Sequence, residues 1–175
     1  MGIDPGTSIM GYSLIRIESG KAILIDMGLV KMKHIQDPYL KLKEIFSQTT
    51  LLIDTHHPDE LAIEAPFFGK NVQSMLKLGR AQGAAIAAAL QRNIPIFEYA
   101  PRKIKLAITG QGSASKEQVA GMLKSILGFK EAPDALDATD ALATAMCHYY
   151  QRQLPETGNY RGWGDFVKKN PARKA

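Results

Sequence analysis

The sequence predicts an α/β fold in which helices flank a mixed five-stranded sheet. Three observations lead to this prediction: three strand-like segments open the chain in succession, two short strands then alternate with helices, and further helices close it. Strands joined by tight turns pair antiparallel, whereas strands separated by helices pair parallel, so both pairings are expected in one sheet. The length of 175 residues fits one domain, which we place at residues 1–154.

The first 32 residues are predicted to form an antiparallel meander. Alternating and apolar segments indicate strands at residues 1–3, 9–17 and 22–32. Asp4-Pro5-Gly6 ends the first strand with turn-forming residues, and Ser19-Gly20 joins the second strand to the third.

A helix is predicted to follow, because Asp37-Pro38 combines an N-cap residue with a proline suited to the first helical turn. The helix is expected to run to about His56. Its apolar face is expected to consist of Leu40, Leu42, Ile45, Phe46, Leu51, Leu52 and Ile53.

The rest of the chain alternates short apolar strands with helices. A buried strand is expected at residues 61–63, directly before Glu64, and another at residues 94–99, where Pro95 suits the start of an edge strand. The capping-box motif Ser115-Lys116-Glu117-Gln118 predicts the start of a helix. The helices of this part are expected at residues 72–91, from Pro101 onward, from Ser115 to about Leu127, and at about 134–152.

Composition and charge narrow the class of protein. The net charge is +5, and residues 151–175 carry six basic side chains against two acidic ones. We therefore expect a basic tail at residues 155–175, which either attracts a polyanion or is simply solvated. The single cysteine, Cys147, excludes an internal disulfide framework and a zinc knuckle. No signal peptide and no apolar run near the ~20 residues of a membrane helix is found, so a cytoplasmic protein without membrane attachment is expected.

Four acidic residues stand where an acid is structurally unfavourable. Asp4 and Glu64 each follow the apolar end of a predicted strand, and Asp137 and Asp140 share one face of the last helix. Each has a structural explanation of its own: a side-chain-stabilised turn, an exposed strand end, or a favourable charge near a helix N-terminus. As a group, however, clustered carboxylates need compensation by protons or cations. We predict that the four acids form one catalytic centre.

A magnesium site fits these oxygen ligands, because Mg²⁺ binds carboxylates, water and phosphate oxygens. We expect two ions per subunit, since a metal pair stabilises both the attacking and the leaving oxygen of a displacement at phosphorus. Mn²⁺ is expected to substitute. The four histidines have no spacing typical of a zinc site. The expected chemistry is therefore metal-dependent phosphodiester hydrolysis.

Residues near the acids are candidates for contacts with nucleic acid. An exposed aromatic ring can stack on an unpaired base, and we assign that role to Phe67 and a packing role to Phe68. Basic side chains would contact phosphates and set the register of binding. The basic candidates are Lys70, Lys77, Arg80, Arg102, Lys103, Lys105 and Lys116.

The helix expected at residues 72–91 is rich in small residues. Gly79 and Gly83 lie four residues apart within it, although glycine inside a helix costs about 1 kcal/mol relative to alanine. Close approach of another backbone would offset this cost. The partner is either the protein's own sheet or a second subunit.

Several motifs together resemble the RuvC family of bacterial Holliday-junction resolvases. The resemblance covers residues 1–152, with the motifs in the family's order. The matching segments are Gly2-Ile3-Asp4-Pro5-Gly6-Thr7 with Gly11-Tyr12, Ala62-Ile63-Glu64-Ala65-Pro66-Phe67-Phe68 with Lys70-Asn71, Leu76 to Gly83, Phe97 to Pro101, Gly110 to Ala114, and Asp137 to Ala143.

This resemblance implies an RNase H-like fold and a homodimer, with the four acids around Mg²⁺ in each subunit. It also implies symmetric cleavage of two opposed strands of a four-way DNA junction, and cooperation with branch-migration motor proteins like RuvA and RuvB. Phe67 matches the family's aromatic residue that engages a base near the junction centre. Lys105 and Lys116 match functional basic positions of the family.

Three alternatives remain open from the sequence. An Asp-x-Gly-Thr turn after a first strand also binds ATP phosphates in actin-like phosphotransferases, although 175 residues leave little room for their second domain. A non-catalytic junction-binding module and an RNase H-like nuclease that acts on RNA are the others. Nucleotide binding and the choice of nucleic-acid substrate would separate them.

Overall fold

The computed structural model describes residues 1–66, 71–129 and 135–153. Within these ranges the order of elements is the predicted one. The elements are β1 (Gly2–Asp4), β2 (Ile9–Glu18), β3 (Lys21–Lys31), α1 (Pro38–His56), β4 (Leu61–Glu64), α2 (Val72–Gln91), β5 (Ile96–Tyr99), α3 (Pro101–Thr109), α4 (Lys116–Leu127) and α5 (Ala135–Gln153). The expected basic tail at residues 155–175, and with it the domain boundary at residue 154, lies outside the described residues and stays a prediction.

The five strands form one mixed sheet in the order β3-β2-β1-β4-β5. The hairpin of β2 and β3 is antiparallel, and β1 pairs antiparallel with β2. On its other side β1 pairs parallel with β4, which pairs parallel with β5. The predicted meander followed by alternating strands and helices is therefore confirmed, and β5 is an edge strand.

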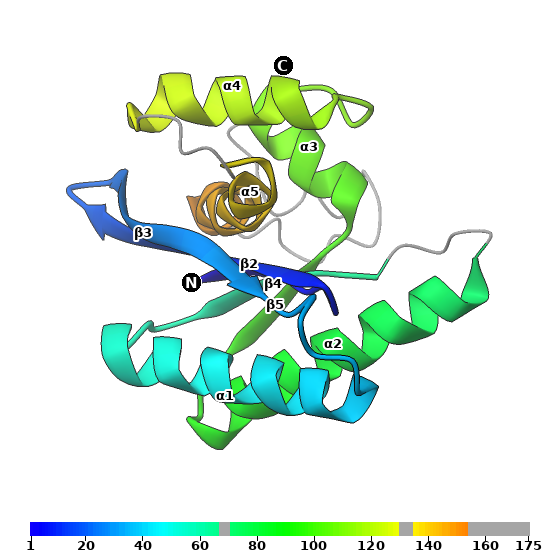
Figure 1. The fold of residues 1–175 in the computed structure, drawn as a ribbon. Helices are drawn as coiled ribbons and strands as arrows, with labels where there is room; N and C mark the ends of the chain where they lie inside the picture. The colour runs from blue at the N-terminus through cyan, green and yellow to red at the C-terminus, as the bar shows by residue number, and fades with distance from the viewer. Residues whose placement is uncertain (67–70, 130–134, 154–175) are drawn as a thin grey trace, which may run out of the picture.

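Helices cover both faces of the sheet. In Figure 1, α1 and α2 lie on one side, and α3, α4 and α5 lie on the other. Each side has its own apolar core: Ile45 and Ile53 of α1 meet Ile3 on the first side, whereas Leu123 of α4 and Leu142 of α5 are buried on the second. None of the helices in the described residues is long and apolar enough to cross a membrane.

Helices α1 and α4 begin directly after the capping residues predicted from the sequence. The Asp37 side chain accepts hydrogen bonds from the backbone N–H groups of Tyr39 and Leu40 at the start of α1. Ser115 and Gln118 form the predicted capping box of α4. Residue 134, at the start of the helix expected at about 134–152, lies outside the described residues.

The predicted apolar face of α1 is wrong at two residues. Leu40 is 55% exposed and Leu51 is 58% exposed, while Leu52 and Ile53 are buried. Each residue step turns a helix by about 100°, so Leu51, Leu52 and Ile53 cannot all face the sheet. The apolar residues of α1 form a wider band than the sheet and α2 can cover.

Helix α5 lies unusually close to β1 and β2, because two glycines face it. A Cβ atom at Gly2 would lie 2.3 Å from the Ala141 carbonyl oxygen, and one at Gly11 would lie 2.4 Å from the Asp137 carbonyl oxygen. These distances are shorter than any that a real Cβ atom adopts. The absence of two side chains therefore lets the backbone of α5 rest directly on the sheet.

We predict that Gly11→Ala destabilises the protein by about 1–3 kcal/mol, since the added methyl group must push α5 away from β2. Gly121→Ala is the matched control, because nothing lies within 4 Å of a Cβ at this position in α4. The control is expected to gain up to about 1 kcal/mol from helix propensity. Urea denaturation measures both, and equal stability of the two variants would contradict the close approach.

Candidate active site

Two of the four predicted acids lie side by side at the ends of parallel strands. Asp4 is the last residue of β1, and Glu64 is the last residue of β4. The register pairs Gly2 with Ala62 and Ile3 with Ile63, so the next residues along both strands are these two acids. Adjacent parallel strands lie about 4.8 Å apart, which brings their carboxylates to the same edge of the sheet.

The other two acids are brought to this edge by α5. Asp4 pairs with Gly11 across β1 and β2, and the backbone of Asp137 packs on Gly11. Asp140 lies one turn further along α5. The electrostatic influence of Asp140 and Asp137 on Asp4, and of Asp4 and Asp140 on Glu64, shows that all four acids share one neighbourhood.

Burial and mutual repulsion change the acidity of this cluster. Burial raises the pKa of Asp4 to about 6, and the negative charges of Asp140 and Asp137 add to this effect. Burial also raises the pKa of Glu64 to about 8, with further contributions from Asp4 and Asp140. The pKa of Asp140 is raised by burial as well, although Lys116 opposes the shift. The cluster therefore holds protons that isolated acids would release, unless cations compensate it.

Lys116 supplies positive charge within the cluster. Its Nζ atom donates a hydrogen bond to Oδ2 of Asp140 and lies 3.6 Å from Oδ1 of Asp137. Burial lowers the pKa of Lys116, but the hydrogen bond and the charges of Asp140 and Asp137 outweigh it, so the net pKa is raised. Lys105 lies near enough to lower the pKa values of Glu64 and Asp140. Lys105 and Lys116, the two lysines that match functional positions of the resembled family, therefore both lie near the acids.

The carboxylate oxygens of this cluster suit a hard divalent cation. Such a cation would also offset the repulsion between the four negative charges. As the side chains stand, no group of three or more His, Cys, Asp or Glu in the described parts of the chain is placed to hold a metal ion. Lys116 occupies the space between Asp137 and Asp140 instead. Joint binding of one ion by three of the acids therefore requires their side chains to turn toward it.

A polar contact that the sequence did not reveal lies behind Glu64. Nε2 of Gln82 in α2 donates a hydrogen bond to Oε2 of Glu98 at 2.9 Å and lies 3.4 Å from the carbonyl oxygen of Glu64. Glu98 is on β5, next to Ile63 of β4. Gln82 is buried, and its long polar side chain on an alanine-rich face of α2 was the available signal. It ties α2 to the strand that carries Glu64.

The remaining predicted residues are less closely linked to the acids. Phe67 and Lys70 lie outside the described residues. Lys77 and Arg80 are exposed on α2, and Arg80 lines a cavity together with Pro66 and Glu98 near the end of β4. The predicted DNA contacts of these residues stay predictions.

The chain is similar to proteins of one family over most of its length. Residues 1–148 match the family model described as crossover junction endodeoxyribonuclease RuvC. RuvC of Christiangramia forsetii is 59% identical over 174 residues, which are 99% of this chain and 91% of that protein. RuvC of Bacteroides fragilis is 57% identical over 177 residues, 99% of this chain and 94% of that protein. The structure of Thermus thermophilus RuvC in complex with a Holliday junction substrate is 34% identical and has a TM-score of 0.78, covering 86% of this chain and 93% of that one.

We predict that Asp4 and Glu64 make the metal-free protein less stable as the pH rises from about 4 to about 8. Their raised pKa values mean that these two side chains bind more protons in the folded state than in the unfolded state in this window, so a higher pH weakens their contribution to stability. Glu64→Gln removes the larger shift and is expected to flatten the dependence. Urea denaturation with a chelator, at about pH 5 and about pH 8.5, measures the difference. The same pH dependence in both proteins would show that Glu64 is not part of a repulsive cluster.

Proposed function

Since the chain belongs to the RuvC family of crossover junction endodeoxyribonucleases, we propose that it cuts four-way DNA junctions at a centre formed by Asp4, Glu64, Asp137 and Asp140. The observation that carries this assignment is the meeting of these acids from β1, β4 and α5 at one edge of the sheet. Hydrolysis of a phosphodiester bond in a Holliday junction, as a step of DNA recombination and repair, is the reaction of the family to which the chain belongs.

The acids are proposed to hold divalent cations, with Mg²⁺ the natural choice and Mn²⁺ able to substitute. Two bound ions would stabilise the attacking and the leaving oxygen of an in-line displacement at phosphorus. The role of the protein is to keep four carboxylates close together against their mutual repulsion. Asp4 and Glu64 are held by strand pairing, and Asp137 and Asp140 by the packing of α5.

Lys105 and Lys116 are proposed to contact phosphate groups beside the scissile bond. Lys116 is 52% exposed at its side chain, although it is bonded to Asp140, so its ammonium group remains accessible to an incoming phosphate. A phosphate oxygen offers the same charge-assisted hydrogen bond that the carboxylate offers now. Lys70, Lys77 and Arg80 are proposed to bind the DNA backbone further away, and Phe67 to stack on a base at the junction centre.

A homodimer is proposed to form through α2. Val72, Leu76, Gly79 and Gly83 follow one another at spacings of four, three and four residues, which places them on one side of the helix. Val72 is 57% exposed and Leu76 is 48% exposed, and nothing lies within 4 Å of a Cβ at either glycine. The glycines therefore do not serve packing on the protein's own sheet. A symmetric pair of subunits would present two active sites to a two-fold symmetric junction.

Branch-migration motor proteins like RuvA and RuvB are proposed as further partners, on the strength of family membership. A non-catalytic junction-binding module is the second candidate function. Retention of all four acids in one cluster favours the enzyme.

We predict that Asp4→Asn, Glu64→Gln, Asp137→Asn and Asp140→Asn each lower junction cleavage by at least about a hundredfold, since even a residue that only supports a metal ligand contributes 10–100-fold. Junction binding is expected to remain largely intact. The measurement is a cleavage assay on a synthetic four-way DNA junction over a titration of Mg²⁺, with binding measured separately by gel shift.

Asp54→Asn is the matched control. Asp54 is a surface acid on α1 and forms an ion pair with Arg92, at the end of α2. Its cleavage rate is expected to match that of the unaltered protein. Loss of binding together with cleavage in the four acid variants would indicate a folding role. Absence of cleavage by the unaltered protein with Mg²⁺ or Mn²⁺ would favour the binding module.

We predict that Leu76→Glu converts the dimer to a monomer, because the interface would bury an unpaired carboxylate. Leu51→Glu is the control, since Leu51 is also an exposed leucine, at 58%, but belongs to α1 and not to the proposed interface helix α2. Sedimentation velocity measures the mass of each. A monomeric unaltered protein, or a dimeric Leu76→Glu protein, would rule out this interface.

A further inference from the structure

A group of lysines lies at the edge of the sheet where the four acids meet, on the face that α1 covers. Lys31 ends β3, Lys33 follows in the next loop, and Lys41 and Lys43 belong to the first two turns of α1. In Figure 1, α1 lies on the opposite face of the sheet from α3 and α4, which carry the two lysines near the acids. We call Lys31, Lys33, Lys41 and Lys43 the α1 basic surface.

Backbone pairing places this surface beside the end of β1. β1 and β3 run in the same direction, because both pair antiparallel with β2, so they end at the same edge of the sheet. The register carries β3 two residues past the level of Asp4, to Lys31. Beyond it, the Met32 N–H donates a hydrogen bond to the Ser8 carbonyl oxygen at 2.9 Å. The loop that carries Lys33 is therefore bonded to the turn that follows Asp4.

Sheet geometry gives the separation of Lys31 from Asp4. β3 lies two strand spacings from β1, roughly 10 Å, and two residues along a strand add about 7 Å. The two backbones are therefore on the order of 12 Å apart. A DNA duplex rises about 3.4 Å for each base pair, so this separation corresponds to about three or four base pairs. A duplex arm that leaves the acids toward α1 brings the phosphates at that distance to the α1 basic surface.

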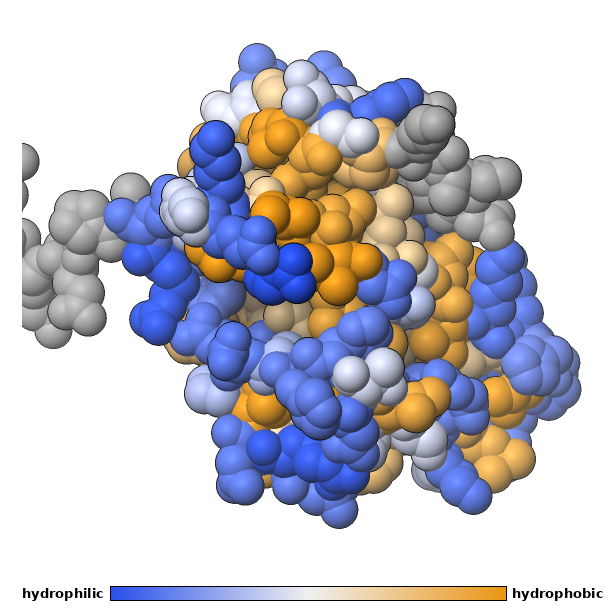
Figure 2. All heavy atoms as spheres, turned by 90° about the vertical axis from the view of Figure 1, so that its left-hand side faces the viewer, coloured by the Kyte–Doolittle hydropathy of each residue, from blue (hydrophilic) through white to orange (hydrophobic). Residues whose placement is uncertain are grey.

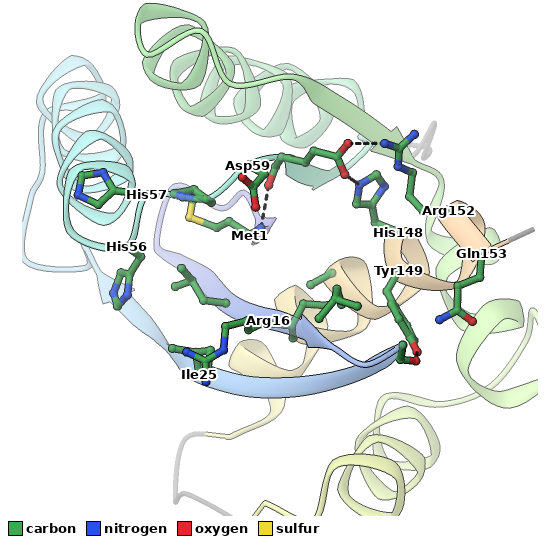
Figure 3. A pocket seen from close by; sticks show the side chains of 17 residues that line it. Met1, Arg16, Ile25, His56, His57, Asp59, His148, Tyr149, Arg152 and Gln153 are labelled. Carbon is green, nitrogen blue, oxygen red and sulfur yellow. Dashed lines mark hydrogen bonds and ion pairs between the residues drawn. The ribbon is translucent and has the colours of Figure 1, made fainter.

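The cations of this surface differ from those at the opposite end of the sheet. Lys33, Lys41 and Lys43 form no ion pair with any carboxylate in the parts of the chain that the structure describes. At the opposite end, apolar side chains gather around the β2–β3 hairpin (Figure 2). Arg152 is paired there with Glu60 at 2.9 Å (Figure 3). Positive charge available to an anionic partner is thus found on the side of the acids.

The charges of α1 run against its helix dipole. The N-terminal end of a helix attracts negative charge and disfavours positive charge. The first turn of α1 has no acidic residue, the N-cap carboxylate of Asp37 is bonded to backbone N–H groups, and Lys41 is the fourth residue of the helix. Asp54 lies near the other end. These lysines therefore do not serve the stability of the helix, whereas an anionic partner at this edge would compensate their charge.

We propose that the α1 basic surface binds the phosphate backbone of a junction arm, about three or four base pairs from the scissile phosphate. DNA is the partner because this surface continues the edge at which the acids lie. The inference rests on the proposed function, which places the scissile phosphate at the acids. It adds contacts on the α1 face of the sheet to those proposed for the lysines on the other face. Phosphate contacts of this kind fix the register of the DNA and carry no base preference.

The first test compares Lys33→Gln and Lys41→Gln with Lys21→Gln, a matched control at the hairpin end of β3, far from the acids. Binding to a synthetic four-way junction is followed by fluorescence anisotropy over a range of salt concentrations, with a chelator to prevent cleavage. Each lost phosphate contact lowers the slope of log K against log salt by about 0.9, which corresponds to about eightfold weaker binding at about 0.1 M salt. We expect this change for Lys33→Gln and Lys41→Gln and little change for Lys21→Gln. The same slope for all three variants and the unaltered protein would overturn the proposal.

A second test identifies the phosphates. The junction carries neutral methylphosphonates about three and four base pairs from the scissile phosphate in each arm. The unaltered protein is expected to bind this junction at least about fivefold more weakly than the ordinary one. Lys33→Gln is expected to lose little further, because the contact is already absent. Losses that simply add would show that Lys33 acts by long-range attraction and would refute the contact.

These measurements separate the α1 basic surface from the proposed function. A protein that binds and cleaves the ordinary junction, but shows additive losses in the second test, lacks this contact and keeps its activity. Absence of cleavage by the unaltered protein with Mg²⁺ would instead count against the proposed function.

Discussion

The contact between α5 and the centre of the sheet is the constraint on which the rest of the site depends. Gly2 and Gly11 present bare backbone to the helix, and Ala141 and Ala145 present little more. Side chains of ordinary size would hold the helix several ångströms further away. At that separation Asp137 and Asp140 would no longer share an environment with Asp4 and Glu64. The small size of these four residues therefore makes the proposed catalytic geometry possible.

The clustering of the four acids lowers the stability of the folded protein at the proposed active site. Four carboxylates, two of them on strands and two on a helix, are brought together where burial weakens their hydration, and the pKa values of Asp4 and Glu64 rise in consequence. The apolar cores on both faces of the sheet hold the backbone in place against this repulsion. Lys116 relieves part of it through Asp140. The apolar cores thus keep the four acids close together, and the repulsion between the acids favours the binding of cations.

The sequence predicted the elements well because their signals are local. The N-cap at Asp37, the capping box at Ser115 and the apolar run before Glu64 each depend on a few neighbouring residues. It also predicted that the four acids lie together, from their unfavourable positions and from the family resemblance, and the structure brings them to one edge of the sheet. What it could not supply depends on contacts between distant segments: which leucines of α1 stay exposed, and the bond from Lys116 to Asp140. Register and helix placement decide all of these.

The bond between Gln82 and Glu98 has a mechanical consequence. Gln82 belongs to α2, on the flank next to the exposed Gly79 and Gly83, and its amide also reaches the strand end that holds Glu64. Because the Gln82 side chain is buried, a displacement of α2 would leave its amide unpaired, so this bridge resists sliding more than an apolar contact does. Helix and strand end are therefore locked into one rigid unit. A displacement of α2 would therefore be passed through this bridge to the end of β4, where Glu64 lies.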